Sequence, residues 1–231
     1  MLARSILLLI YSLGFVSVFS QVITPTTEQL ERKGKHYLFP EFSEAQIIRK
    51  DGNDSKGELN YNLITEEIII NIGNGMVAYA PIDPVEKIII ENVELIPIQG
   101  VIYQLLVDGK VRLLVHRKQT MERTGQQTGL GRTAGTYTND ANTYSSEPDY
   151  IPTLKDKQIL YYMILPGNFG LKNVNTYFIW QNGALKPLRR LKQLEAFVSD
   201  KNALKMFLKK EKIKVDSEED LIKAIHYCNN E

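Results

Sequence analysis

The chain has 231 residues, and 28 Lys or Arg against 27 Asp or Glu give it a formal charge of +1. Removal of residues 1–20 would take away Arg4 and no acidic residue, which leaves a neutral remainder with 27 residues of each sign. This balance gives no electrostatic reason to expect nucleic acid or an anionic membrane as a partner. With 43% apolar residues, the chain can bury a core in one large domain or two small ones.

The N-terminus predicts an exported protein. Arg4 precedes the apolar run Ser5–Phe19, which is shorter than the ~20 residues that cross a bilayer and suits the apolar part of a signal peptide. Val18 and Ser20 occupy the positions where a signal peptidase prefers small residues, so we expect cleavage between Ser20 and Gln21. A retained membrane anchor is the alternative. Lipid attachment at the new N-terminus is not expected, because no cysteine lies there.

From Ile47 to Lys118 the sequence reads as successive short β-strands. The clearest hairpin is at 101–118, where Asp108-Gly109 allows a positive φ between two runs rich in Val, Leu and Ile. No helical stretch separates these strands, so an antiparallel meander is favoured over parallel βαβ units.

The segment ELNYNLI shows the alternation most clearly. Leu59, Tyr61 and Leu63 lie on one face of the expected strand, and Asn60 and Asn62 lie on the other. A period of two is typical of a half-buried strand, so we expect the asparagines on its polar face.

The second half predicts two aromatic-rich strands, at 157–165 and 174–183, and then helices. RLKQLEAFV and NALKMFLKK have apolar residues at helical spacing. DSEEDLIKAIHYC is the best-specified helix, because Asp216 or Ser217 can cap it and acidic residues fill its first turn.

These patterns predict an α+β protein that is mainly β. We expect an antiparallel β-meander, as an open sheet, a sandwich or a partial barrel, followed by a short C-terminal helical tail. The predicted parts are a signal peptide at 1–20, a β-rich domain at 21–190 with a long flexible loop at 119–152, and a helical segment at 191–231.

The glycine-rich stretch TGQQTGLGRTAGTYTND, at 124–140, resembles a phosphate-binding loop only superficially. Five residues separate Gly125 from Gly131 where a P-loop has four, and Arg132 stands where lysine is needed. No helical period follows, so no helix N-terminus would complete an anion site. A long loop between strands is the better interpretation. Its Tyr137, Tyr144 and Tyr150 could contact a sugar or peptide by stacking, or could simply be solvated.

Other motifs predict no catalytic, cofactor-binding or metal-binding residue. DGNDSKGE lacks the glycine and the glutamate of a calcium loop, with Lys56 and Asn62 in their places, so we expect a polar turn. His36, His116 and His226 lie in different segments without metal-ligand spacing, and we expect His116 at an exposed strand edge.

The lone cysteine and the basic clusters have structural explanations. Cys228 cannot form an intrachain disulfide, and we expect it to be a half-buried helix residue. The basic clusters KPLRRLK and KKEKIK are interpreted as a solvated face rather than a nucleic-acid site.

The segments GELNYNLITEEIIIN, KVRLLVHRK and LKKEKIKVDSEEDLIKAI together resemble a group of uncharacterised exported β-rich proteins of Gram-negative bacteria. Those proteins pair a strand of the form N-Y-N-L-x-T-x-E with a Lys-rich, acid-capped C-terminal helix. The resemblance covers most of the chain after residue 20 and implies export and a common fold. It implies no activity, because none of its motifs is tied to chemistry.

Two functions remain open. The preferred hypothesis is a non-enzymatic binding or accessory component of the cell envelope, in the periplasm or at the cell surface, with a protein or glycan partner and no cofactor, nucleic acid or membrane span after signal removal. The alternative is a secreted hydrolase of sugars or peptides whose acid and base come from carboxylates such as Glu66, Glu67, Glu91 or Asp108.

Overall fold

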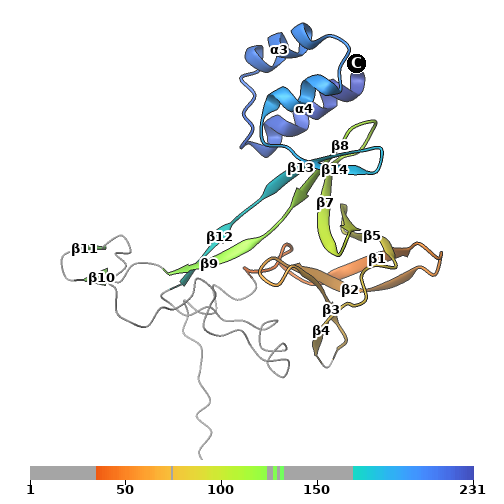
Figure 1. Ribbon diagram of the computed structural model, residues 1–231. Helices are drawn as coiled ribbons and strands as arrows, with labels where there is room; N and C mark the ends of the chain where they lie inside the picture. Colours follow the sequence, from red (N-terminus) through yellow and green to blue (C-terminus); the bar gives the residue numbers. More distant parts are fainter. Residues whose placement is uncertain (1–34, 74, 124–126, 129–130, 133–168) are drawn as a thin grey trace, which may run out of the picture.

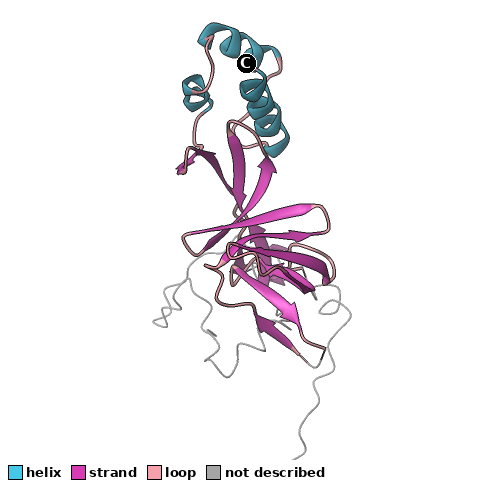
Figure 2. Ribbon diagram, turned by 90° about the vertical axis from the view of Figure 1, so that its right-hand side faces the viewer, coloured by secondary structure: helices cyan, strands magenta, loops and turns pink. Residues whose placement is uncertain are grey.

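The computed structural model describes residues 35–73, 75–123, 127–128, 131–132 and 169–231 (Figure 1). The predicted signal peptide and the strand predicted at 157–165 lie outside them. The described residues form mainly antiparallel β-structure, and the helices gather at one end of the molecule (Figure 2). The predicted fold class is confirmed.

Ten strands form one open antiparallel sheet, in the order β14-β13-β8-β7-β6-β5-β1-β2-β3-β4. The bounds are β1 Ser43–Arg49, β2 Ser55–Asn62, β3 Glu67–Asn71, β4 Met76–Ala78, β5 Val85–Ile90, β6 Val93–Ile98, β7 Val101–Val107, β8 Arg112–His116, β13 Thr176–Gln181 and β14 Ala184–Pro187. Two separate pairs join β9 Gln119–Arg123 to β12 Phe169–Asn173, and β10 Gln127–Thr128 to β11 Gly131–Arg132. Most neighbours in the main sheet are consecutive in the chain, as a meander requires.

The main sheet coils until two of its strand ends meet. The backbone N–H of Gln119 donates to the carbonyl of Leu63 at 2.7 Å, and the Tyr61 hydroxyl donates to the carbonyl of Arg117 at 3.2 Å. These contacts join the end of β2 to the end of β8, although four strands separate them in the sheet. The coil encloses a core from both halves, with Leu59 of β2 and Ile102 of β7 in one buried cluster.

The asparagines of β2 are buried, which corrects the prediction of a polar face. Residues 36–38 pair with the end of β2 through backbone hydrogen bonds, and the Asn60 side chain holds the residues that follow them, Phe39 and Glu41. Asn60 Oδ1 accepts from the backbone N–H groups of Phe39 and Tyr61 at 3.1 and 2.8 Å, and its Nδ2 donates to the carbonyls of Phe39 and Glu41 at 2.9 and 3.0 Å. Alternation placed Asn60 on the correct face of β2, but it could not show that another segment bonds to its side chain.

Asn62 shapes the turn from β2 into β3. Its Oδ1 accepts from the backbone N–H groups of Ile64 and Thr65 at 3.0 and 3.2 Å, and its side chain is fully buried. The two asparagines of the N-Y-N-L motif therefore have different structural roles. The first fixes a neighbouring segment and the second fixes a turn.

The helical tail contains η1 Leu191–Ala196, α3 Lys201–Lys210 and α4 Glu218–Asn230. Asp200 caps α3 by accepting from the backbone N–H groups of Asn202 and Ala203, and Ser217 caps α4 by accepting from Asp220. The first predicted helix is a 3₁₀-helix of six residues rather than an α-helix. The last helix agrees with its prediction.

The tail docks on the β7–β8 hairpin and β13 through an apolar interface. Leu221, Ala224, Ile225 and Cys228 of α4 are buried in one cluster with Val111 and other apolar residues of these strands. Cys228 is completely buried rather than half-buried, because this face of α4 points into the cluster. Burial raises the pKa of its thiol to about 11.

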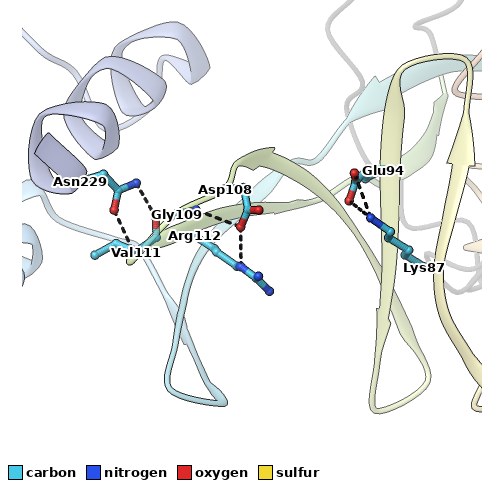
Figure 3. A network of polar contacts seen from close by, with 7 residues as sticks. All are labelled: Lys87, Glu94, Asp108, Gly109, Val111, Arg112 and Asn229. Atoms are coloured by element: carbon cyan, nitrogen blue, oxygen red, sulfur yellow. Dashed lines mark hydrogen bonds and ion pairs between the residues drawn. The ribbon is translucent and has the colours of Figure 1, made fainter. Parts of the chain in front are cut away.

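A side-chain amide fixes the end of α4 to the hairpin (Figure 3). The Val111 backbone N–H donates to Asn229 Oδ1 at 2.8 Å, and Asn229 Nδ2 donates to the Val111 carbonyl at 2.9 Å. Gly109, at φ 148°, allows this approach, because a Cβ there would lie 2.6 Å from Asn229 Nδ2. Across the β5–β6 pair, the same figure shows Lys87 bonded to both carboxylate oxygens of Glu94 at 3.2 Å.

We expect Asn229→Ala to lower the free energy of unfolding by about 2 kcal/mol, because both backbone groups of Val111 lose their partner. Asn230→Ala, at the exposed neighbouring position, is the matched control and should change it by less than about 0.5 kcal/mol. Gly109→Ala should also destabilise the protein, yet combined with Asn229→Ala it should cost less than the sum, since the colliding amide is gone. Denaturant titration measures the free energy of unfolding of all four variants. Strict additivity of Asn229→Ala and Gly109→Ala would show that the two residues do not interact.

We expect Asn60→Ala to cost about 3 kcal/mol, because it removes a buried amide that makes four hydrogen bonds. Asn71→Ala is the matched control, since that side chain donates to Glu58 and, through its Oδ1, accepts from the Gly73 N–H, both in exposed surroundings. Thermal unfolding and hydrogen exchange at the amide of Phe39 check the prediction. Equal effects of the two substitutions would show that residues 36–41 do not depend on Asn60.

Candidate functional site

Strands β9 and β12 form a two-stranded ribbon, called the arm below, that continues β8 and β13 out of the main sheet. The ribbon pairs from Gln119 opposite Asn173 to Arg123 opposite Phe169. Figure 1 shows the arm running away from the main sheet and from the helical tail. Residues 119–123 are thus a strand, whereas the sequence placed them in the flexible loop. They lack apolar alternation, and their partner strand is distant in the sequence.

Among the described residues the two strands of the arm pair with each other, and the backbone N–H of Gln119 also donates to Leu63. Lys172 pairs with Glu122 at 2.9 Å and Gln119 with Asn173 at 2.8 Å, so the cross-strand contacts are polar and balanced in charge. Free backbone donors and acceptors along the edge of a two-stranded ribbon can add a strand from another chain.

The first polar cluster at the base of the arm centres on Glu66, which lies in the β2–β3 turn at φ 59°. One of its carboxylate oxygens lies 2.8 Å from His116 Nε2, and the other accepts from the Lys118 ammonium. The His116 side chain is only 19% exposed and sits on an inner strand of the sheet, which corrects its predicted edge position. Burial raises the pKa of the nearby Tyr61 hydroxyl, and the charge of Glu66 adds to this effect.

The second polar cluster lies around Arg117, the residue between His116 and Lys118. Arg117 Nε donates to Gln104 Oε1 of β7 at 2.7 Å, and its Nη2 donates to Glu218 Oε1 of α4 at 2.8 Å. The Tyr177 hydroxyl of β13 donates to the other Glu218 oxygen at 3.1 Å, and burial together with this carboxylate raises the pKa of Tyr177. Arg117 therefore links the arm base to the tail.

A shallow depression of about 400 Å³ lies where the arm base meets the tail. Its polar lining includes Asn173, Asn175 and Thr176 from the strands and Arg189 and Asp216 from the tail segments. Amide, hydroxyl and charged groups in a shallow site suit a polar partner surface better than an apolar small molecule.

The carboxylates considered for a hydrolase lie in different turns. Glu66 is engaged by a histidine and a lysine, Glu91 accepts from Ser43 in the β5–β6 turn, and Asp108 pairs with Arg112 in the β7–β8 turn. Glu67 begins β3. The segment DGNDSKGE is a polar turn that runs into β2, and the described residues contain no group of three potential metal ligands.

The predicted contact residues Tyr137, Tyr144 and Tyr150 lie outside the described residues. The arm nevertheless leads to their segment, because β9 ends at Arg123 and β12 begins at Phe169. The sequence did not predict the Glu66–His116–Lys118 cluster. Its only local signal was the alternation that places His116 and Lys118 on the same face.

No protein-family model matches the chain, and neither the curated proteins nor the solved structures include a similar one. None of the described helices is long and apolar enough to cross a membrane.

We expect Arg117 and Glu218 to be coupled by about 1 kcal/mol in a double-mutant cycle with Arg117→Ala and Glu218→Ala, because both side chains are partly buried. The comparison pair is Lys56 and Glu44, whose side chains are 64% and 74% exposed and whose coupling should be near zero. Denaturant unfolding measures both cycles. Equal coupling of the two pairs would mean that Arg117 does not fix the tail.

Proposed function

We propose that this protein is an exported, non-enzymatic binding or accessory component of the Gram-negative cell envelope, in the periplasm or at the cell surface. The arm carries the proposal, because its two strands pair only with each other among the described residues and run away from the main sheet. Its partner is a protein or a glycan, reached through the arm and the segment between Arg123 and Phe169. The apolar run Ser5–Phe19 and the resemblance to exported proteins support the location.

The structure of the arm base suits a fixed support for binding. Arg117 and Glu218 join it to the tail, while Glu66 joins it to the β2–β3 turn. A support that is held on both sides loses less conformational entropy when a partner binds. The arrangement is of the kind in which binding loops are positioned by a rigid scaffold.

The positions of the carboxylates support the alternative function, a carboxylate hydrolase, less well than a binding function. Such chemistry uses two carboxyl groups facing one substrate bond, roughly 5–9.5 Å apart. Glu66 has both oxygens engaged by cationic or histidine side chains, and Glu91 and Asp108 lie in other turns. A binding role needs none of these carboxylates to be free.

The test is a variant in which an Asn-Gly turn replaces residues 124–168. Arg123 and Phe169 are opposite each other in the arm, so a two-residue turn can close the hairpin. We expect the variant to keep the unfolding midpoint of the parent and to lose its specific partners in pull-downs from envelope fractions. A second variant, in which Ser replaces Tyr137, Tyr144 and Tyr150 in the full chain, then shows whether these tyrosines contribute to partner binding.

The matched control keeps 124–168 and replaces by Ser the exposed pair Lys56 and Glu44, which lies outside the arm. It leaves the net charge unaltered and should keep every specific partner. If the shortened variant, which keeps β9 and β12, retains every specific partner, residues 124–168 do not contain the binding element. If it fails to fold, the Tyr→Ser variant alone decides whether that segment binds.

A further inference from the structure

The part of the chain from β14 to the end of the segment after α3 carries a strong local excess of positive charge that the net charge of the chain hides. Residues 186–214 contain ten Lys and Arg against three Asp and Glu, a formal charge of +7. Residues 35–123 contain ten Lys and Arg against thirteen Asp and Glu, a formal charge of −3. Residues 215–231, which contain α4, hold five Asp and Glu against one Lys, a formal charge of −4. At the end of the molecule where the helices gather (Figure 2), the positive charge therefore belongs to α3 and the segments beside it and not to the tail as a whole.

The cations of the tail are available to a partner. All ten are exposed, and between described residues the one ion pair they form joins Lys205 to Glu195 at 3.6 Å. The acidic residues that follow are partly engaged elsewhere. Glu218 holds Arg117 and Tyr177, and Asp220 accepts from the backbone N–H of Lys214 at 3.1 Å.

Helix α3 arranges part of this charge on one surface. Lys201, Lys205 and Lys209 follow each other at intervals of four residues, so they form a stripe along the helix. Viewed down the helix axis, Met206 projects between Lys209 and Lys210, on the half of α3 that faces away from the tail core. Its side chain is 68% exposed. The opposite face packs into the tail core through Leu204 and Phe207.

We propose that the α3 face of the tail docks on an anionic lipid surface. Lysine ammonium groups attract anionic headgroups without fixed geometry, and an exposed methionine among them can enter the interfacial region. Single-stranded nucleic acid fits less well, because its binding sites stack bases on aromatic side chains. The two aromatic residues of 186–214 are Phe197 and Phe207, and both pack against the tail core. This inference does not depend on the arm or its partner.

The experiment compares binding of the full chain to phosphatidylcholine vesicles with and without about 30 mol% phosphatidylglycerol, by co-sedimentation. The triple variant Lys201, Lys205 and Lys209→Gln should bind the anionic vesicles about 100-fold more weakly, at roughly a factor of five per lysine, and the neutral vesicles as before. The matched control is Lys50, Lys56 and Lys110→Gln, which removes the same charge from exposed positions outside the tail and should change it little.

A second readout separates the tail from the N-terminal apolar run, which all variants share. Met206→Trp should give a blue-shifted emission with anionic vesicles but not with neutral ones, relative to the parent chain with Trp180 alone. Raising the salt from about 0.05 to 0.5 M should reverse the shift. No shift, equal loss in the two triple variants, or binding to duplex DNA without binding to anionic vesicles would each overturn the proposal.

Discussion

At the base of the arm, three successive side chains of one extended segment face alternate sides, and this alternation joins the parts of the molecule. His116 and Lys118 meet Glu66 on one side, while Arg117 meets Gln104 and Glu218 on the other. A strand places successive residues on opposite faces, so a shift of one residue would exchange these partners. The register of β8 therefore determines both where the arm begins and how the tail is oriented.

The free energy of the tail interface comes mainly from apolar burial. Leu221 and Ile225 are fully buried, and each contributes about 2 kcal/mol, whereas a partly exposed ion pair such as Arg117–Glu218 contributes about 1 kcal/mol. The polar contacts instead fix the position of α4. Glu218 holds its first turn and Asn229 holds its last turn, so the helix can neither slide nor rotate on the apolar surface without losing hydrogen bonds.

The parts of the fold that were predicted correctly depend on local signals. The β7–β8 hairpin has its Asp108-Gly109 turn, and α4 has a cap, acidic first-turn residues and an apolar face within a short stretch. The errors concern residues whose surroundings come from distant segments. Asn60 is buried because residues 36–41 lie against it, and β12 is a strand because β9 lies beside it. Periodicity describes one segment at a time and cannot show either arrangement.

The basic clusters at 186–192 and 209–214 were interpreted as a solvated face, because the neutral total charge gave no reason to expect an anionic partner. Net charge sums over the whole chain, so the +7 of residues 186–214 disappears into a neutral total once the −4 of residues 215–231 and the −3 of residues 35–123 are added. What a partner meets is the field of the nearest surface, since separated charges are screened beyond about 10 Å at 0.1 M salt. The lysines of α3 therefore set the field that an approaching partner would meet at that face, whatever the charge of the distant sheet. Because the Arg117–Glu218 contact connects the arm base to the tail, a partner bound at the arm, as proposed, would have a fixed orientation to a surface bound at α3.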